Sequence, residues 1–243
     1  MDTITGAGLQ HERLSSPVAE RPSGPAAMRV IVHDEPTAAG HMAYDERLAD
    51  EGIPTLRLFR WNRPALSFGY RQRPPAWIAG SGPAAAGVDC VERPTGGGVA
   101  VHGSDLSCSV VRARRAGARL RDVMAALCEG MARACRAVDV AVAWNVDVEA
   151  ATPIAYCLTQ TSPYALTVGR RKLCGFAVRA YGASWLIQGS LLVRAIPEAI
   201  QRLMPPSVRH AYDARAICLE EAAGMGLNDA AVIDGVLHAM RDV

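Results

Sequence analysis

The chain has 243 residues, of which 50% are hydrophobic and 21% are charged, a balance that fits one globular domain with a core of ordinary size. Its formal net charge of +2 is too small to favour a nucleic-acid-binding protein. No apolar run reaches the length of a membrane span, so we expect no membrane partner. Residues 1–27 lack the apolar segment of a signal peptide, which predicts a disordered tail before a domain at 28–243.

The cysteine content bears on compartment and metal binding. Seven cysteines are scattered through the chain, form no CxxC pair and leave one unpaired. This pattern predicts reduced thiols in a cytoplasmic protein rather than a disulfide framework or a zinc site. We therefore expect no metal.

From residue 28 to residue 111 the sequence has the pattern of short strands around one longer helix. The expected elements are, in chain order, a strand at 28–36, a helix at 36–51, strands at 55–61 and 65–70, a broken helix at 76–87, and strands at 88–93 and 98–111. The turn residues at 62–64 predict that the strands on either side of them form a hairpin.

The second half contains the clearest helix and a run of strands. The expected elements are a helix at 120–138, three strands between 164 and 193 that form a meander, and helices at 196–204, 216–224 and 228–241. Strands and helices occur in runs, not in strict alternation. The sequence therefore predicts an α+β fold in a single domain, with a mixed or antiparallel sheet flanked by helices.

Three consecutive glycines, Gly96 to Gly98, interrupt a strand-like segment. Glycine weakens a strand, so the run indicates either a flexible hairpin loop or a place where a ligand lies against bare backbone. Arg93 before the run and His102 after it add polar groups. The run matches neither of the glycine-rich nucleotide motifs GxGxxG and GxxxxGK[ST], and the glycines by themselves leave both interpretations open.

Two residues further along carry reactive groups. Cys157 lies in a polar loop, where nearby basic residues at 170–172 can favour a nucleophilic thiolate; an inert thiol is the alternative. Lys172 begins an apolar strand, where a buried lysine can polarise a carbonyl or activate a nucleophile; a surface lysine is the alternative. Four other cysteines lie within strand or helix patterns and are interpreted as core residues: Cys108, Cys128, Cys135 and Cys174.

Six motifs in the same order resemble the lipoate/octanoate branch of the biotin and lipoate protein ligase superfamily, and within it the cysteine-dependent octanoyltransferases. They are HMAYDERL (41–48), LRLFRWNRPALSFGYRQ (56–72), RPTGGGVAVHGSDLSCS (93–109), GRRKLCGFA (169–177), QGSLLV (188–193) and ICLEEAAG (217–224). The resemblance covers residues 28 to 225 and implies the catalytic-domain fold of that superfamily.

The resemblance also implies roles for particular residues. Cys157 would be the acyl-accepting nucleophile, 15 residues before Lys172, which would contact the acyl carbonyl. The residues implied to bind the acyl substrate are Arg93, Thr95, Gly96, Gly97, Gly98, His102, Gly175, Gln188 and Gly189. The chain departs from the family pattern at four positions: Glu92 replaces an arginine, Asp105 a glutamate, Cys108 an aromatic residue and Gln188 a histidine.

The implied activity is transfer of an octanoyl group from acyl carrier protein, through an acyl-cysteine, to the lysine of a lipoyl domain or of the glycine-cleavage H protein, without a cofactor. One alternative is an ATP-dependent lipoate–protein ligase that uses lipoyl-AMP; the end of the chain at residue 243, without a further C-terminal domain, counts against it. A second alternative is a non-catalytic protein that binds lipoyl domains or acyl carriers.

Overall fold

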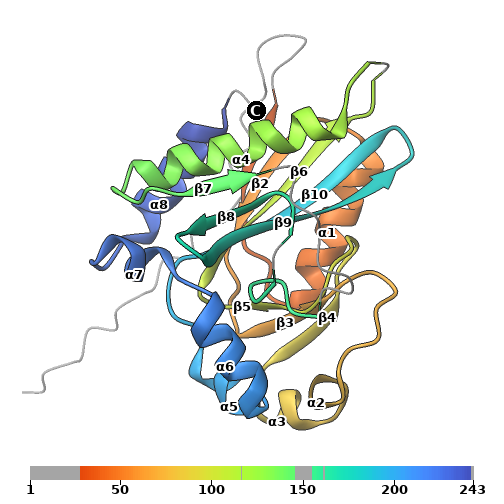
Figure 1. Cartoon of the computed structure of the whole chain (residues 1–243). Helices are drawn as coiled ribbons and strands as arrows, with labels where there is room; N and C mark the ends of the chain where they lie inside the picture. Colours follow the sequence, from red (N-terminus) through yellow and green to blue (C-terminus); the bar gives the residue numbers. More distant parts are fainter. Residues whose placement is uncertain (1–27, 116, 146–154, 161, 242–243) are drawn as a thin grey trace, which may run out of the picture.

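The computed structural model of the protein describes residues 28–115, 117–145, 155–160 and 162–241 (Figure 1). The tail expected at residues 1–27 lies outside these described residues. Within them, no helix is long and apolar enough to cross a lipid bilayer.

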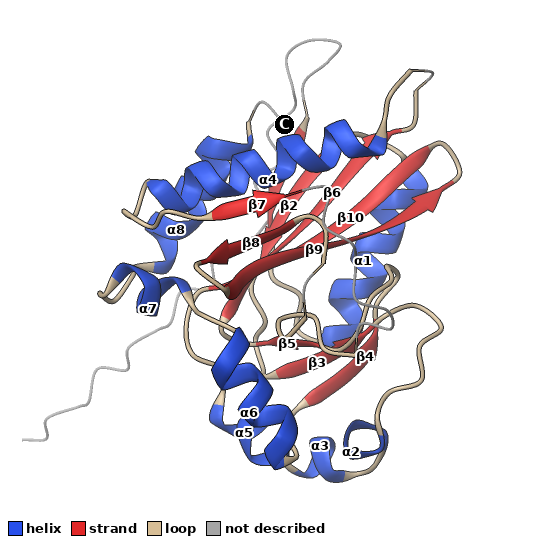
Figure 2. Ribbon diagram, viewed as in Figure 1, coloured by secondary structure: helices blue, strands red, loops and turns tan. Residues whose placement is uncertain are grey.

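A seven-stranded sheet forms the centre of the fold (Figure 2). Its strands, in spatial order, are β1 (Arg29–Val32), β2 (Thr55–Phe59), β6 (Asp105–Ala113), β10 (Ser184–Leu192), β9 (Arg171–Tyr181), β8 (Ala165–Val168) and β7 (Ala143–Asn145). Only β1 and β2 run parallel; the other neighbours are antiparallel. The predicted meander is confirmed as β8, β9 and β10, whereas the short edge strand β7 was not expected from the sequence.

A second, three-stranded sheet has the order β4 (Asp89–Glu92), β3 (Ala65–Phe68), β5 (Ala100–His102). The predicted hairpin between 55–61 and 65–70 is therefore wrong, because β2 belongs to the large sheet and β3 to the small one. All five residues of β2 are buried, since the strand pairs with β1 and β6 and is covered on both faces. The turn at 62–64 connects the two sheets instead.

Helices cover both sheets (Figures 1 and 2). Their bounds are α1 (Ala38–Glu51), α2 (Ala76–Ala79), α3 (Gly82–Ala85), α4 (Leu120–Arg136), α5 (Glu198–Leu203), α6 (Pro206–Arg215), α7 (Leu219–Ala223) and α8 (Asp229–Met240). Helix α1 packs against β10 of the large sheet and β4 of the small one, so it joins the two. Helix α6 was not expected, and the broken helix expected at 76–87 is two single turns.

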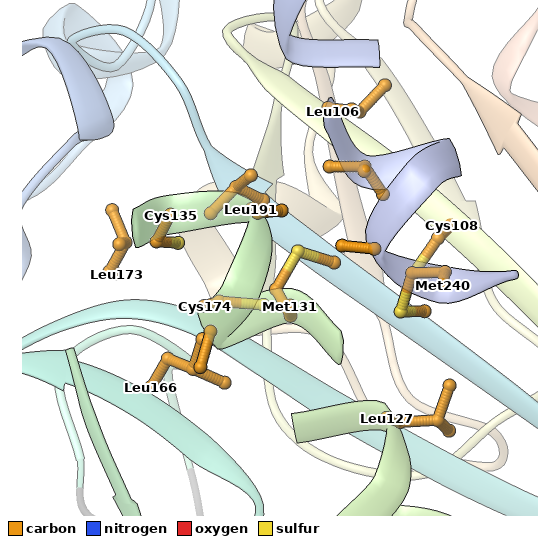
Figure 3. Packing of buried hydrophobic residues seen from close by; sticks show 14 of the residues in the cluster. Leu106, Cys108, Leu127, Met131, Cys135, Leu166, Leu173, Cys174, Leu191 and Met240 are labelled. Carbon is orange, nitrogen blue, oxygen red and sulfur yellow. The ribbon is translucent and has the colours of Figure 1, made fainter. Parts of the chain in front are cut away.

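The main core lies between the large sheet and helices α4 and α8. Figure 3 shows Met131 and Cys135 of α4 beside Cys174 of β9 and Leu191 of β10, and Leu127 of α4 belongs to the same core cluster. The repeat of apolar residues every four positions in α4 therefore has the predicted result, an apolar face turned to the sheet. The expected α+β single-domain fold is confirmed.

The strand expected at 98–111 is in fact two strands, β5 and β6, separated at Gly103. Gly103 has φ of +109°, and a Cβ there would lie 3.0 Å from the Cα of Pro64. Only glycine adopts this conformation readily and allows so close an approach. The break sends β5 into the small sheet and β6 into the large one, so a space between the sheets is lined from both.

Candidate functional site

A largely apolar pocket is lined by both sheets, by α1 and by the loop that contains Cys157. Its apolar wall includes Met42, Phe59, Trp61, Leu158 and Phe176. Eight of the residues expected to form the site line it: Arg93, Gly97, His102, Cys157, Lys172, Gly175, Gln188 and Gly189. The structure thus brings together residues that lie far apart in the sequence.

The remaining three expected residues, Thr95, Gly96 and Gly98, support the pocket wall without lining it. The Nη2 atom of Arg93 donates hydrogen bonds to the carbonyl oxygens of Gly96 (2.6 Å) and Gly98 (2.8 Å). The glycine run therefore wraps around a buried guanidinium. It is not a flexible hairpin loop, since the strands on either side of it, β4 and β5, both pair with β3 and not with each other.

The central glycine has a specific reason to lack a side chain. Gly97 has φ of +92°, and a Cβ at this position would lie 2.8 Å from Nη2 of Arg93. A second close approach was missed from the sequence: a Cβ at Gly69 would lie 2.8 Å from the carbonyl carbon of Gly96. The glycine in SFGYRQ was the available signal, because a glycine directly after a strand often marks such backbone contact. The absence of side chains at Gly97 and Gly69 therefore allows neighbouring segments of the protein to pack closely, in addition to shaping the pocket.

The two neighbouring glycines provide a matched test. Gly97→Ala is expected to lower the free energy of unfolding by about 1–3 kcal/mol, because alanine is strained at positive φ. By displacing Arg93 it should also slow the acyl transfer that the resemblance implies. Gly96→Ala should change neither, since a Cβ there meets nothing within 4 Å. Urea unfolding and transfer rates measure both effects; equal stability of the two variants would contradict this account of the loop.

Cys157 is held at the pocket by main-chain bonds to the strand that leaves the glycine run. Its N–H donates to the carbonyl of Val99 (2.8 Å), and its Sγ lies 3.3 Å from the carbonyl oxygen of Gly98. Nη2 of Arg93 lies 3.6 Å from the same sulfur. The sulfur of Cys157 therefore contacts both a main-chain carbonyl oxygen and a buried guanidinium. The cysteine is half-buried, so its sulfur is reachable from the pocket.

The basic neighbours of Cys157 differ in part from those expected. The guanidinium of Arg171 forms an ion pair with Glu221 and donates to the carbonyl of Ala216. The arginine that contacts the sulfur is instead Arg93, which comes from the other sheet. Sequence proximity favoured the wrong arginine because β9 turns the Arg171 side chain toward α7.

The four cysteines interpreted as core residues are buried. Burial raises the pKa of Cys108, Cys128 and Cys135 to about 12 and that of Cys174 well above its ordinary value. A thiol with so high a pKa is protonated at neutral pH and is a poor nucleophile. Cys108 also lines the pocket. Of the two cysteines that line it, Cys108 is buried and Cys157 is half-exposed.

Lys172 is buried, with 6% of its surface exposed, and its Nζ donates to Ser162 Oγ at 2.6 Å. Burial lowers the pKa of the lysine, and the charge of a nearby Cys157 thiolate acts in the opposite direction. A Cβ at Gly175 would lie 2.9 Å from Cε of Lys172, so this glycine makes room for the lysine side chain. The surface-lysine interpretation is therefore wrong.

Gln188, at the position where the family pattern has a histidine, connects the glycine run to α1. Its Oε1 accepts from Thr95 Oγ1 (2.7 Å) and its Nε2 donates to Asp45 Oδ2 (2.7 Å). Asp45 is fully buried and forms an ion pair with Arg57 at 2.7 Å. Asp45 and Arg57 were missed as part of the site; the signal was an arginine in the middle of an apolar strand, because a buried charge requires a partner.

The shorter carboxylate at Asp105 still reaches the neighbouring histidine. Its Oδ2 lies 2.9 Å from His102 Nδ1 and accepts from Ser107 and Ser190. In the described part of the chain no cluster of three or more His, Cys, Asp or Glu side chains could hold a metal ion.

Comparison with known proteins identifies the family of this chain. Residues 37–241 match the family described as lipoyl protein ligase A/B catalytic domain. Octanoyltransferase LipM of Kyrpidia tusciae is 30% identical over 217 residues, which span 81% of this chain and 79% of that protein. The same enzyme of Carboxydothermus hydrogenoformans is 29% identical over 185 residues, which span 72% and 68% of the two chains.

Two solved structures share the fold at lower identity. A crystal structure of lipoate-protein ligase A bound with ATP has a TM-score of 0.73 at 19% identity, covering 89% of this chain and 85% of that one. A bi-partite lipoate protein ligase from Thermoplasma acidophilum, described together with its E2 lipoyl domain, has a TM-score of 0.70 at 18% identity, covering 89% and 83%.

The two-sheet fold, the pocket that both sheets line and the match over 37–241 define the class: the chain belongs to the lipoyl protein ligase A/B catalytic domain family. Its relatives with about 30% identity are octanoyltransferases, and the chain is accordingly an enzyme that acts as an acyltransferase. The family that the six motifs resembled is thereby confirmed.

Proposed function

We propose that this protein is an octanoyltransferase of protein lipoylation. The observation that carries the proposal is the place of Cys157: a half-exposed thiol at a largely apolar pocket, 3.6 Å from a buried guanidinium. The wall around it accommodates an alkyl chain. The names of the relatives, octanoyltransferase LipM, support octanoyl as the group transferred.

The reaction proceeds in two steps that share one acyl-enzyme. The Cys157 thiolate attacks the thioester carbonyl of octanoyl-acyl carrier protein, a C–S bond to the enzyme forms, the C–S bond to the carrier breaks, and the carrier leaves as its thiolate. The lysine amine of a lipoyl domain or H protein then attacks the octanoyl-cysteine, and the Cys157 thiol is released. Lys172 stabilises the oxygen that becomes negative in each step. No cofactor is required, because the thioester already supplies an activated acyl group.

The experiment is acyl transfer without ATP. Purified protein, octanoyl-acyl carrier protein and a lipoyl domain are mixed, and we expect the mass of the lipoyl domain to increase by one octanoyl group. A lipoyl domain whose acceptor lysine is replaced by arginine is the control. Modification that requires ATP and free octanoate or lipoate would identify a ligase, and binding of the lipoyl domain without any modification would identify a non-catalytic binding protein.

A further inference from the structure

A serine that the proposed mechanism does not use lies next to His102. Ser67, in β3, is 1% exposed and lines the pocket. Strands β3 and β5 are antiparallel, with Ala65 opposite His102 and Ser67 opposite Ala100. Ser67 and His102 are therefore diagonal neighbours on one face of the small sheet. Ser67 Oγ lies 2.8 Å from His102 Nε2.

The directions of the hydrogen bonds follow from Asp105. Burial alone raises the pKa of this carboxyl, but His102 and the hydroxyls that bond to it lower the pKa below its ordinary value. The ionised carboxylate only accepts hydrogen bonds, so His102 Nδ1 carries a proton and donates it at 2.9 Å. In the neutral imidazole Nε2 then has a free lone pair, and Ser67 donates its hydroxyl hydrogen to that nitrogen.

The imidazole of His102 is fixed in place by an aromatic neighbour. The Trp61 ring stacks on it with centroids 4.0 Å apart and an interplanar angle of 18°. Trp61 Nε1 donates to Ser107 Oγ at 2.9 Å, and Ser107 donates to Asp105 Oδ2 at 2.8 Å. The Trp61 ring, the Asp105 carboxylate and the Ser107 hydroxyl therefore hold His102 in the one arrangement in which all of these hydrogen bonds form.

One guanidinium connects this group to the nucleophile. Nη1 of Arg93 donates to Ser67 Oγ at 3.2 Å, while Nη2 of the same side chain lies 3.6 Å from Cys157 Sγ. Ser67 Oγ has one lone pair left after it accepts from Arg93, and the serine faces the pocket. An N–H group that approaches an acyl group on Cys157 can donate to this lone pair.

From these contacts we propose that Ser67, His102 and Asp105 form a proton relay that deprotonates the attacking amine in the second step. This inference rests on the proposed octanoyl transfer and deepens it. As the amine nitrogen forms its bond to the acyl carbon, its proton passes to Ser67 Oγ, and the hydroxyl proton of Ser67 passes to His102 Nε2. The C–S bond breaks, and the imidazolium held by Asp105 returns the proton to the Cys157 thiolate.

The second step requires such a base. When the neutral lysine amine bonds to the acyl carbon its nitrogen becomes cationic, and this nitrogen must lose a proton before the neutral amide can form. A histidine can accept a proton near neutral pH, and general base catalysis of this kind contributes about 100- to 10,000-fold. Asp105 bonds directly to His102. The other charged or titratable groups are Arg93, Cys108, Cys157 and Lys172, which line the same pocket, and His41, which packs on Trp61.

The test separates the two steps with His102→Gln. Octanoyl-enzyme is prepared from the wild type and the variant, its formation is verified by mass, and it is then mixed with a lipoyl domain or with hydroxylamine. Hydroxylamine is uncharged at neutral pH and needs no base. We expect transfer to the lipoyl domain to slow by about 100-fold and discharge by hydroxylamine to remain as in the wild type. Ser67→Ala should show the same split with a smaller loss.

The pH profile provides an independent measurement. With the wild type, transfer to the lipoyl domain should show an acidic limb, because a base that already holds a proton accepts no further one. This acidic limb should be absent in His102→Gln and present in His210→Gln, a control on the exposed face of α6. Equal slowing with both acceptors, an unchanged limb, or an octanoyl group on Ser67 in a Cys157→Ala protein would overturn the relay. Failure of the wild type to form any octanoyl-enzyme would instead refute the proposed transferase.

Discussion

Cys157→Ala is expected to abolish octanoyl transfer, because the variant lacks the sulfur to which the acyl group is attached. Incubation of the wild type with octanoyl-acyl carrier protein should increase the enzyme mass by one octanoyl group. Hydroxylamine should remove that group, as it does from thioesters. Intact-protein mass spectrometry of the variant should show no adduct, and Cys157→Ser should not acquire one by thioester chemistry.

The other cysteines allow a matched control for this experiment. Cys90 is exposed on β4, outside the pocket, so Cys90→Ala should retain both the adduct and the transfer activity. Cys108 is a stricter comparison, because it lines the same pocket but is buried with a pKa of about 12. An adduct that persists in Cys157→Ala and disappears in Cys108→Ala would show that Cys108, and not Cys157, is the nucleophile.

Lys172→Ala should reduce transfer by about 100- to 1,000-fold, the usual loss when one stabiliser of a developing oxyanion is removed. The loss is expected in kcat rather than in substrate binding, since the ammonium group is needed most when the carbonyl oxygen becomes negative. Lys172→Arg should not restore the rate, because a planar guanidinium does not fit the space that Gly175 leaves for the lysine. Near-normal activity of Lys172→Ala would remove the lysine from the mechanism.

The lowered pKa of Lys172 predicts how activity changes with pH. Burial disfavours the charged form, so the lysine loses its proton at a pH below the 10.5 of a free lysine. Because the cation is the form that stabilises the oxyanion, activity should fall as pH rises through this lowered pKa. The residual activity of Lys172→Ala should lack this alkaline limb, which a pH–rate profile of the acylation step measures.

The sequence by itself determined the elements with strong local patterns and indicated the two residues that we propose as the reactive pair. The helix at 120–138 and the meander at 164–193 follow from apolar periodicity, which depends only on neighbouring residues. Cys157 and Lys172 were selected by residue type and by their place in family-like motifs, and the structure places both at one pocket. In each case the information is local, or is contained in the order of the motifs.

Only the tertiary structure decided which residues surround that pair. The turn at 62–64 is compatible with a hairpin, but burial of both faces of β2 assigns β2 and β3 to different sheets. Arg93 reaches Cys157 from 64 residues away in the sequence, because the loop of Cys157 bonds to Val99 next to the small sheet, and it takes the place expected of Arg171. Ser67 is adjacent to His102 only because β3 and β5 pair. Contacts of this kind depend on strand pairing between distant segments, and no local periodicity encodes them.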